Sequence, residues 1–452
     1  MSAAAAVDSP ASWRVLAGCC IVAIFGVTSL YGSTFGLMML PMQKELGWSR
    51  GDITFSLTLM TLVGPAILPL VGWMIDKVAL RPLILWGVLL QSASLAAFGF
   101  MHGSVWVYYA LCLVMIFTAT GASFLTLSKL LQTWFDKAFG RALGILFALI
   151  TVGAVIHPQI VRLVIAHASW RQAFMAMGGL SLVFGGLAAW FLVRERDRTA
   201  DAAQANATAA SGMAAASQFG EPGQPGQPGQ LGQPGLTGQS SPSCSSAAPV
   251  SMRAFLSDRI WWILAFWNMF FGFAVAGILV HFAAMVQDRG MSLAQAATAM
   301  SLIGAGGFVG NLMAGWLIDH TSASRLARWF VLAPLGATAM LYFGSSVGLV
   351  IAAAVLLGVF NSGDHSLSVF LARRYFNAES FGRASATQQV ATTFGAGTAP
   401  WLMGLVHDRT GSYDVALMVS MGAFVLAAIA AWWLPDFRPG QEPAPAMAPA
   451  AA

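Results

Sequence analysis

The sequence predicts an all-α membrane protein with twelve transmembrane helices in two six-helix bundles related by a pseudo-twofold axis. Three observations lead to this prediction: the apolar composition, the long apolar runs, and a motif that occurs once in each half. The 452 residues are 57% hydrophobic and 9% charged, with a mean hydropathy of +0.71. A water-soluble core could not bury this much apolar surface, so we expect the chain to lie in a lipid bilayer.

Apolar runs of spanning length predict the helices. A hydrocarbon core of about 30 Å requires roughly 20 residues of apolar helix. Runs bounded by charged residues account for six helices between Arg14 and Arg194, and for six more between Arg259 and Asp436. The first run, which reaches Gln43, is too long for a cleavable signal, so we expect it to remain as a membrane anchor.

The two halves repeat the same landmarks in the same order. Residues 72–81, GWMIDKVALR, are echoed by residues 315–325, GWLIDHTSASR. The second helix of each half begins with a capping-box pattern, at residues 49–52 and 292–295. Other pairs at nearly the same offset are Gly47 with Gly290, Gly121 with Gly363, Gly140 with Gly382, Arg141 with Arg383, and Pro158 with Pro400. This register indicates a parallel repeat of one six-helix unit.

The expected boundaries follow from these runs. Between residues 220 and 238 glycine recurs every third residue, with Gln and Pro between, a composition typical of a flexible linker. We therefore expect a disordered tail at 1–12, a bundle at 13–196, a disordered cytoplasmic linker at 197–252, a second bundle at 253–438 and a disordered tail at 439–452.

The charges predict the orientation and exclude several functions. Most of the 23 Lys and Arg residues fall on one side of the predicted spans. The positive-inside rule then puts both termini in the cytoplasm, and we expect the protein in a bacterial inner membrane. The bases are too scattered for a nucleic-acid groove, and the four cysteines show no disulfide or metal spacing. The sequence contains no nucleophile–base grouping and no phosphate loop, so we expect neither an enzyme nor a cofactor. We also expect a monomer.

A single acid inside a predicted span suggests a coupling site. Of the 18 Asp and Glu residues only Asp364 falls within a span, about 13 Å from the helix end. Charge is costly at that depth and therefore points to function, and a buried carboxyl group can exchange a proton near neutral pH. Asn361, Asp364, His365 and Ser368 share one helix face, so we predict proton coupling at Asp364 and His365. The alternative is a neutral Asp364 that only bonds a neighbouring helix.

Other polar residues in the spans are candidates for binding a solute. His157 precedes a proline inside the fifth helix, where it could titrate, bind the solute or bond a carbonyl freed by the proline. For the amide side chains, hydrogen bonding between helices is the alternative. The predicted substrate-binding residues are Tyr31, Thr118, His157, Asn268, Asn311, Asn361 and Gln388.

Several short motifs are similar to one branch of a known family. They lie at residues 46–50, 72–81, 134–142, 290–292, 374–382 and 399–413. In these segments the chain resembles the bacterial monocarboxylate-porter-like branch of the major facilitator superfamily. The resemblance implies a carrier of small carboxylates, commonly with a proton, in which two halves rock around a central site. It also implies a conformational latch at the cytoplasmic helix ends, made here of Gly72, Asp76, Lys77, Arg81, Gly315, Asp319 and Arg325.

One position departs from this pattern. Many such carriers hold the substrate carboxylate with an Arg four residues before the glycine that corresponds to Gly315, and this chain has Asn311 there. An amide supplies hydrogen bonds but no full charge. Either the carboxylate meets His157, His365 or Lys129, or the solute is not a simple monocarboxylate.

The expected function is secondary active transport of a small organic solute, with a carboxylate as one candidate, coupled to protons across the lipid bilayer. Import is favoured over export. Two alternatives stay open: a proton-driven exporter of an amphiphilic compound, and a membrane solute sensor that keeps the fold without turnover and uses the linker as its output.

Deleting residues 205–245 separates the transporter from the sensor. We expect the deletion to leave solute uptake intact, because the linker joins the bundles without lining a site. Uptake measured in cells beside a surface-expression control tests this. A variant that still binds solute but has lost a downstream response would support the sensor.

Overall fold

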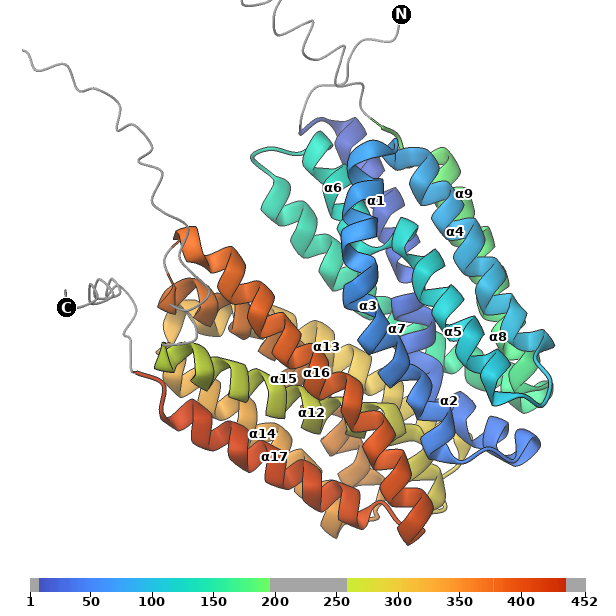
Figure 1. The fold of residues 1–452 in the computed structure, drawn as a ribbon, viewed down its shortest axis with the longest axis vertical. Helices are drawn as coiled ribbons and strands as arrows, with labels where there is room; N and C mark the ends of the chain where they lie inside the picture. Colours follow the sequence, from blue (N-terminus) through green and yellow to red (C-terminus); the bar gives the residue numbers. More distant parts are fainter. Residues whose placement is uncertain (1–7, 196–257, 377, 436–452) are drawn as a thin grey trace, which may run out of the picture.

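The computed structural model describes residues 8–195, 258–376 and 378–435. Within these ranges the side chains of a few residues, among them Asp76, Asp319 and His365, lie outside the description. The expected linker at 197–252 and the tail at 439–452 also lie outside the described residues, as do residues 1–7 of the N-terminal tail. The described chain is helical, and its two halves form the arms of a V (Figure 1).

The N-terminal arm contains six spans, three of which are interrupted. Its elements are α1 (Pro10–Ile24), α2 (Val27–Leu46), α3 (Arg50–Lys77), α4 (Leu80–Ala97), η1 (Phe98–Phe100), α5 (Val105–Ala119), η2 (Thr120–Ala122), α6 (Phe124–Trp134), α7 (Phe139–His167), α8 (Trp170–Leu180), η3 (Ser181–Gly185) and α9 (Gly186–Phe191). α1 with α2, α5 with α6, and α8 with α9 each make one span.

The C-terminal arm contains six continuous helices. They are α12 (Arg259–Asp288), α13 (Leu293–His320), α14 (Ala323–Phe343), α15 (Val347–Tyr375), α16 (Ala378–Thr410) and α17 (Asp414–Trp432). In the described residues ten segments are long and apolar enough to cross a membrane, and the bent helix α3 makes an eleventh. α16 is the fifth helix of its arm and corresponds by the repeat to α7, so it is the twelfth predicted span.

The predicted starts of α3 and α13 are confirmed. The Ser49 side chain caps α3 together with Asp52, and the Ser292 side chain caps α13 together with Gln295, each as a reciprocal capping box. Before each cap a glycine turns the chain in a left-handed conformation, with φ of 70° at Gly47 and 83° at residue 290. The repeat therefore extends to the turn chemistry.

Two spans that the sequence predicted as continuous are broken. The first breaks at Phe25 and Gly26, where Gly26 has an extended conformation. The fourth breaks after η2, where Ser123 is extended and its side chain caps α6. At this break a Cβ on Gly121 would lie 2.8 Å from the Cα of Gly87, so the close approach of α4 requires glycine.

The two arms touch at one end and separate at the other. The contacts join α3 to α16 and α7 to α13: the Thr58 hydroxyl donates to the Gly397 carbonyl at 2.6 Å, and the Ser301 hydroxyl to the Val155 carbonyl at 2.7 Å. We call this the closed end. At the opposite end of α3, Trp73 is 59% exposed. The start of α1, the end of α9, the start of α12 and the end of α17 lie on that divergent side, which we call the linker end (Figure 1).

Glycine contacts within the C-terminal arm generate a stability prediction. A Cβ on Gly310 would lie 2.0 Å from the Val359 carbonyl oxygen, so α13 and α15 must separate in a Gly310→Ala variant. We expect a loss of about 1–3 kcal/mol, measured as a lower unfolding temperature of the purified protein. Gly336→Ala in α14 is the matched control because no described atom lies within 4 Å of its Cβ. Equal unfolding temperatures for the two variants would contradict the close contact.

Candidate solute-binding site between the two arms

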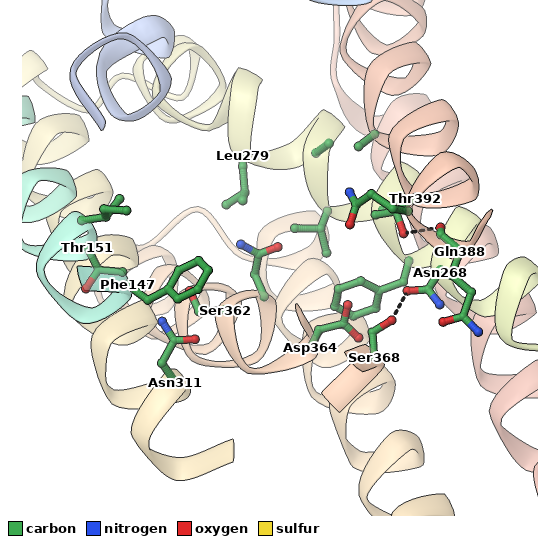
Figure 2. Close-up of a pocket in the computed structure, with 18 residues that line it drawn as sticks. Phe147, Thr151, Asn268, Leu279, Asn311, Ser362, Asp364, Ser368, Gln388 and Thr392 are labelled. Carbon is green, nitrogen blue, oxygen red and sulfur yellow. Dashed lines mark hydrogen bonds between the residues drawn. The ribbon is translucent and has the colours of Figure 1, made fainter. Parts of the chain in front are cut away.

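A cavity of about 470 Å³ lies between the arms, and most of its polar lining comes from the C-terminal arm. Helix α7 contributes Phe147, Ile150 and Thr151 from the N-terminal arm. The remaining described lining belongs to α12, α13, α15 and α16 (Figure 2). The polar residues from these helices are Asn268, Asn311, Asn361, Ser362, Asp364, Ser368, Gln388, Gln389 and Thr392.

Asp364 is a buried carboxyl group at this cavity. It lies inside α15, is 7% exposed, and its Oδ1 atom is buried with no hydrogen-bond partner among the described residues. No Lys, Arg or His is among the described lining residues. A buried polar atom without a partner costs about 1–3 kcal/mol, so such an atom at a cavity indicates a group that a proton or a ligand satisfies.

The side chains near Asp364 combine satisfied and unsatisfied groups. Ser368 donates to Asn268 Oδ1 at 2.8 Å, and Asn268 Nδ2 donates to the Leu264 carbonyl at 2.8 Å. These two hydrogen bonds fix the orientation of the Asn268 side chain. Gln388 is 2% exposed, and its Nε2 atom is buried without a partner. Figure 2 shows Asp364, Ser368, Asn268 and Gln388 on the same side of the cavity. The free Gln388 N–H groups can therefore donate to a solute beside Asp364.

The structure brings several predicted residues together at this cavity: Asn268, Asn311, Asn361, Asp364 and Gln388. Asn361, Asp364 and Ser368 share the cavity face of α15, as their spacing predicts. The side chain of His365, the second predicted coupling residue, lies outside the described residues.

Three other predicted binding residues lie away from the cavity lining. Tyr31 is 4% exposed and its hydroxyl lies 3.3 Å from the hydroxyl of Tyr108. Thr118 bonds within its own arm, to the Ser94 hydroxyl at 3.3 Å. His157 is 1% exposed beside the break between α1 and α2, with Nδ1 3.4 Å from the Ser29 hydroxyl. In this conformation Tyr31 and Thr118 serve packing inside the N-terminal arm, whereas His157 Nε2 is buried with no hydrogen-bond partner among the described residues.

The described residues of the predicted latch lie at the linker end, where the arms diverge (Figure 1). No described atom lies within 4 Å of a Cβ built on Gly72 or Gly315, and Lys77 and Arg325 are exposed. Arg81 donates to the Trp190 carbonyl at 3.0 Å, which joins α4 to α9 within one arm. The Asp76 and Asp319 side chains lie outside the description. The latch stays a prediction for another conformation.

A charged network joins the arms at the closed end, and none of the motifs in the sequence predicted it. The Arg50 side chain is 5% exposed and bonds Asp288 through both terminal nitrogens, at 2.5 and 2.8 Å. Its Nη1 atom also donates to the Tyr413 hydroxyl at 2.7 Å. A bidentate guanidinium–carboxylate pair is among the strongest hydrogen-bonded contacts in proteins. Arg50 therefore joins the start of α3 to the end of α12 through Asp288 and to the start of α17 through Tyr413.

Backbone groups and a histidine extend this network. The main-chain N–H groups of Arg50 and Gly51 donate to the two carboxylate oxygens of Asp408, at 3.0 and 2.7 Å. This places a carboxylate from α16 at the positive end of the α3 dipole. The fully buried His281 lies 2.9 Å from the Tyr413 hydroxyl through Nδ1 and 2.8 Å from the Pro400 carbonyl through Nε2. We assign the proton to Nε2, because a carbonyl can only accept.

One signal in the sequence could have indicated Arg50. By the repeat, Ser49 corresponds to Ser292, so Arg50 corresponds to Leu293. A charged residue that only one half has, directly after a helix cap, suggests a contact with the other half. Its partners Asp288 and Asp408 are hundreds of residues away and no local pattern connects them.

Comparisons with known proteins agree with this geometry. The family model described as Major Facilitator Superfamily matches residues 18–347. The probable sulfoacetate transporter SauU of Cupriavidus necator is 25% identical over 409 residues, covering 87% of each chain. Human monocarboxylate transporter 12 is 21% identical, covering 93% of this chain and 80% of the relative.

Solved structures support the same fold. A bacterial homologue of the human lysosomal transporter Spinster, described as inward-facing and unoccupied, superposes with a TM-score of 0.67 at 14% identity, covering 93% of this chain and 96% of the other. The nucleoside transporter NupG superposes with a TM-score of 0.71 at 12% identity, covering 92% and 98%. The family match, the two six-helix arms and the cavity between them agree, and the chain therefore belongs to the major facilitator superfamily of membrane transporters rather than to an enzyme family.

Proposed function

We propose that this protein is a secondary active transporter that moves a small organic solute by alternating access and couples it to protons through Asp364. The observation that supports this most is a buried, unpartnered carboxyl group at a cavity between two arms. The cavity lies between a closed end and a divergent end. Rocking the arms about the cavity would exchange these two ends.

The orientation follows from the charges. Most of the Lys and Arg residues lie at the linker end when the helices are traced in order, and the positive-inside rule then assigns that end to the cytoplasm. With this orientation the arms diverge toward the cytoplasm, so the protein is in an inward-open state in a bacterial inner membrane. The network around Arg50 then seals the outer face.

Asp364 can serve as the proton carrier because its surroundings change with the arms. In a closed site the neutral carboxyl group is favoured, whereas water in an open site favours the carboxylate. A proton bound on one side is released on the other without a covalent step. His365 follows Asp364 in α15 and is the second proposed coupling residue.

The relatives suggest which solutes to test first. One is named as a probable transporter of sulfoacetate and another as a monocarboxylate transporter. Small carboxylates and sulfonates are therefore the starting set for a binding screen, and import is the proposed direction. The protein is proposed to work as a monomer.

Replacing Asp364 tests the coupling. In proteoliposomes, Asp364→Asn should abolish solute accumulation driven by a pH gradient, because Asn cannot carry the proton, while exchange of solute across the membrane persists. The measurement is radiolabelled uptake with and without the gradient, using the solute that gives the largest shift in the binding screen.

The control is Asp414→Asn, an exposed carboxylate in the first turn of α17. This variant should accumulate solute as the wild type does. Full accumulation driven by the pH gradient in Asp364→Asn would remove Asp364 from the mechanism and leave the fold assignment unaffected.

Breaking the closed-end network should shift the arms. Arg50→Gln removes the bidentate contact with Asp288, a loss on the order of 2–5 kcal/mol for truncating one partner of a buried charge pair. Spin labels at Lys44→Cys and Arg409→Cys, after the four native cysteines are replaced, report the distance across the closed end. We expect longer and broader distances in Arg50→Gln than in the parent.

Arg289→Gln is the matched control for this measurement. Arg289 lies at the same end, but it donates to the Gly344 carbonyl within its own arm. Its distances should equal those of the parent. An unchanged distance distribution in Arg50→Gln would show that the network does not hold the closed end.

A further inference from the structure

We infer that the cavity selects a solute whose hydrogen-bonding end is uncharged, a polyhydroxy or hydroxy-amide compound, rather than a carboxylate or sulfonate anion. This inference rests on the proposed function, because it names the class of solute for the same site. It differs from the class that the names of the relatives suggest.

The polar chemistry of the cavity is dominated by amides. Five amide side chains line it, together with Ser and Thr hydroxyls and one carboxyl group, whereas no Lys, Arg or His occurs among the described lining residues. An amide presents a donor and an acceptor side by side, and two neighbouring hydroxyls of a solute match that pair. The five are Asn268, Asn311, Asn361, Gln388 and Gln389.

Much of this hydrogen-bonding capacity is free. Among the described residues, Gln388 Nε2 has no partner although it is buried, and the side chains of Asn311 and Asn361 make no hydrogen bond. Asn268 is held by the Leu264 carbonyl and by Ser368, so its orientation is fixed before a solute binds. The site can therefore bind a neutral polar group without rearranging its walls.

Among the described residues, no cation lies at the cavity to compensate an anion. Moving a carboxylate or sulfonate from water into a low-dielectric cavity costs several kcal/mol unless a cation meets it. Arg50 is occupied with Asp288 and Tyr413 at the closed end, and Lys129 donates to the Ile75 carbonyl near the linker end. Asp364 in its ionised form would repel an anion further.

A cationic solute fits less well than a neutral one. An amine would pair with ionised Asp364 and exclude the proton from it, so the amine and the proton could not travel together in the proposed import. A neutral solute leaves the carboxyl group free to gain and lose its proton.

The opposite wall, from α7, is mostly apolar, and Thr151 is its one described polar residue. Phe147 and Ile150 of α7 line the cavity across from the amides of the C-terminal arm. Phe271 and Val275 of α12 add apolar surface to the C-terminal side. A solute with hydroxyls on one edge and C–H groups on the other satisfies both walls, as a sugar alcohol does. The cavity volume of about 470 Å³ falls within the size range of small-molecule sites.

Matched solute triplets test the charge class directly. The probes are sorbitol, gluconate and glucamine, which share one carbon skeleton, and lactamide, lactate and 1-amino-2-propanol, which share another. The purified full-length protein is heated with each at equal millimolar concentration and ionic strength. Ligands stabilise the state they bind. We therefore expect that, in one triplet or both, the shift in unfolding temperature caused by the neutral member is about twice the shift caused by either charged member, or larger.

Two variants separate site binding from a solvent effect. Gln388→Ala should lose the shift given by the neutral member, whereas an osmolyte effect would persist in it. Asn311→Arg places a cation at the cavity and should reverse the preference toward gluconate or lactate, with Asn311→Ala as the control for loss of the amide. The unfolding temperature of each variant without solute verifies folding.

A larger shift of the wild type with gluconate, lactate or sulfoacetate than with the neutral members would overturn the inference. A larger shift with either amine would overturn it in favour of a cation paired with Asp364. Both outcomes leave transport and proton coupling standing, because those depend on the accumulation measured with Asp364→Asn.

Discussion

The architecture in this conformation depends on one interaction, the pairing of Arg50 with Asp288 across the two arms. Tyr413, Asp408 and His281 surround it, so a guanidinium, two carboxylates and a helix terminus satisfy each other around an Arg50 side chain that is only 5% exposed. Such a contact is strong when formed and leaves costly unpaired charges when broken. It is therefore suited to hold one end of the molecule shut while the other end stays apart.

The closed end has a direct consequence for the cavity. Close packing of α3 on α16 and α7 on α13 brings the arms together beside Thr58 and Ser301, and the divergence beyond them leaves room for a solute. The N-terminal arm contributes an apolar wall and the C-terminal arm a polar one that contains Asp364. The repeat thus gives two similar scaffolds, while the chemistry is concentrated in one of them.

Much of the fold could be predicted from the sequence because its signals are local. Apolar run lengths predicted the spans, and the caps at Ser49 and Ser292 are present as expected. The spacing of Asn361, Asp364 and Ser368 predicted a shared face that does line the cavity. The breaks at Gly26 and after η2 depend on packing between spans, and the partners of Arg50 depend on the angle between the arms, so no local pattern reveals them.

Alternating access to this cavity is tested most directly by labelling a cysteine at Ser362, which lines it, in a protein whose native cysteines are replaced. In oriented vesicles, a membrane-impermeant thiol reagent should react rapidly from the linker side and slowly from the other side, and Arg50→Gln should increase the rate from that other side. Equal rates from both sides in the parent protein, or no effect of Arg50→Gln, would contradict the account.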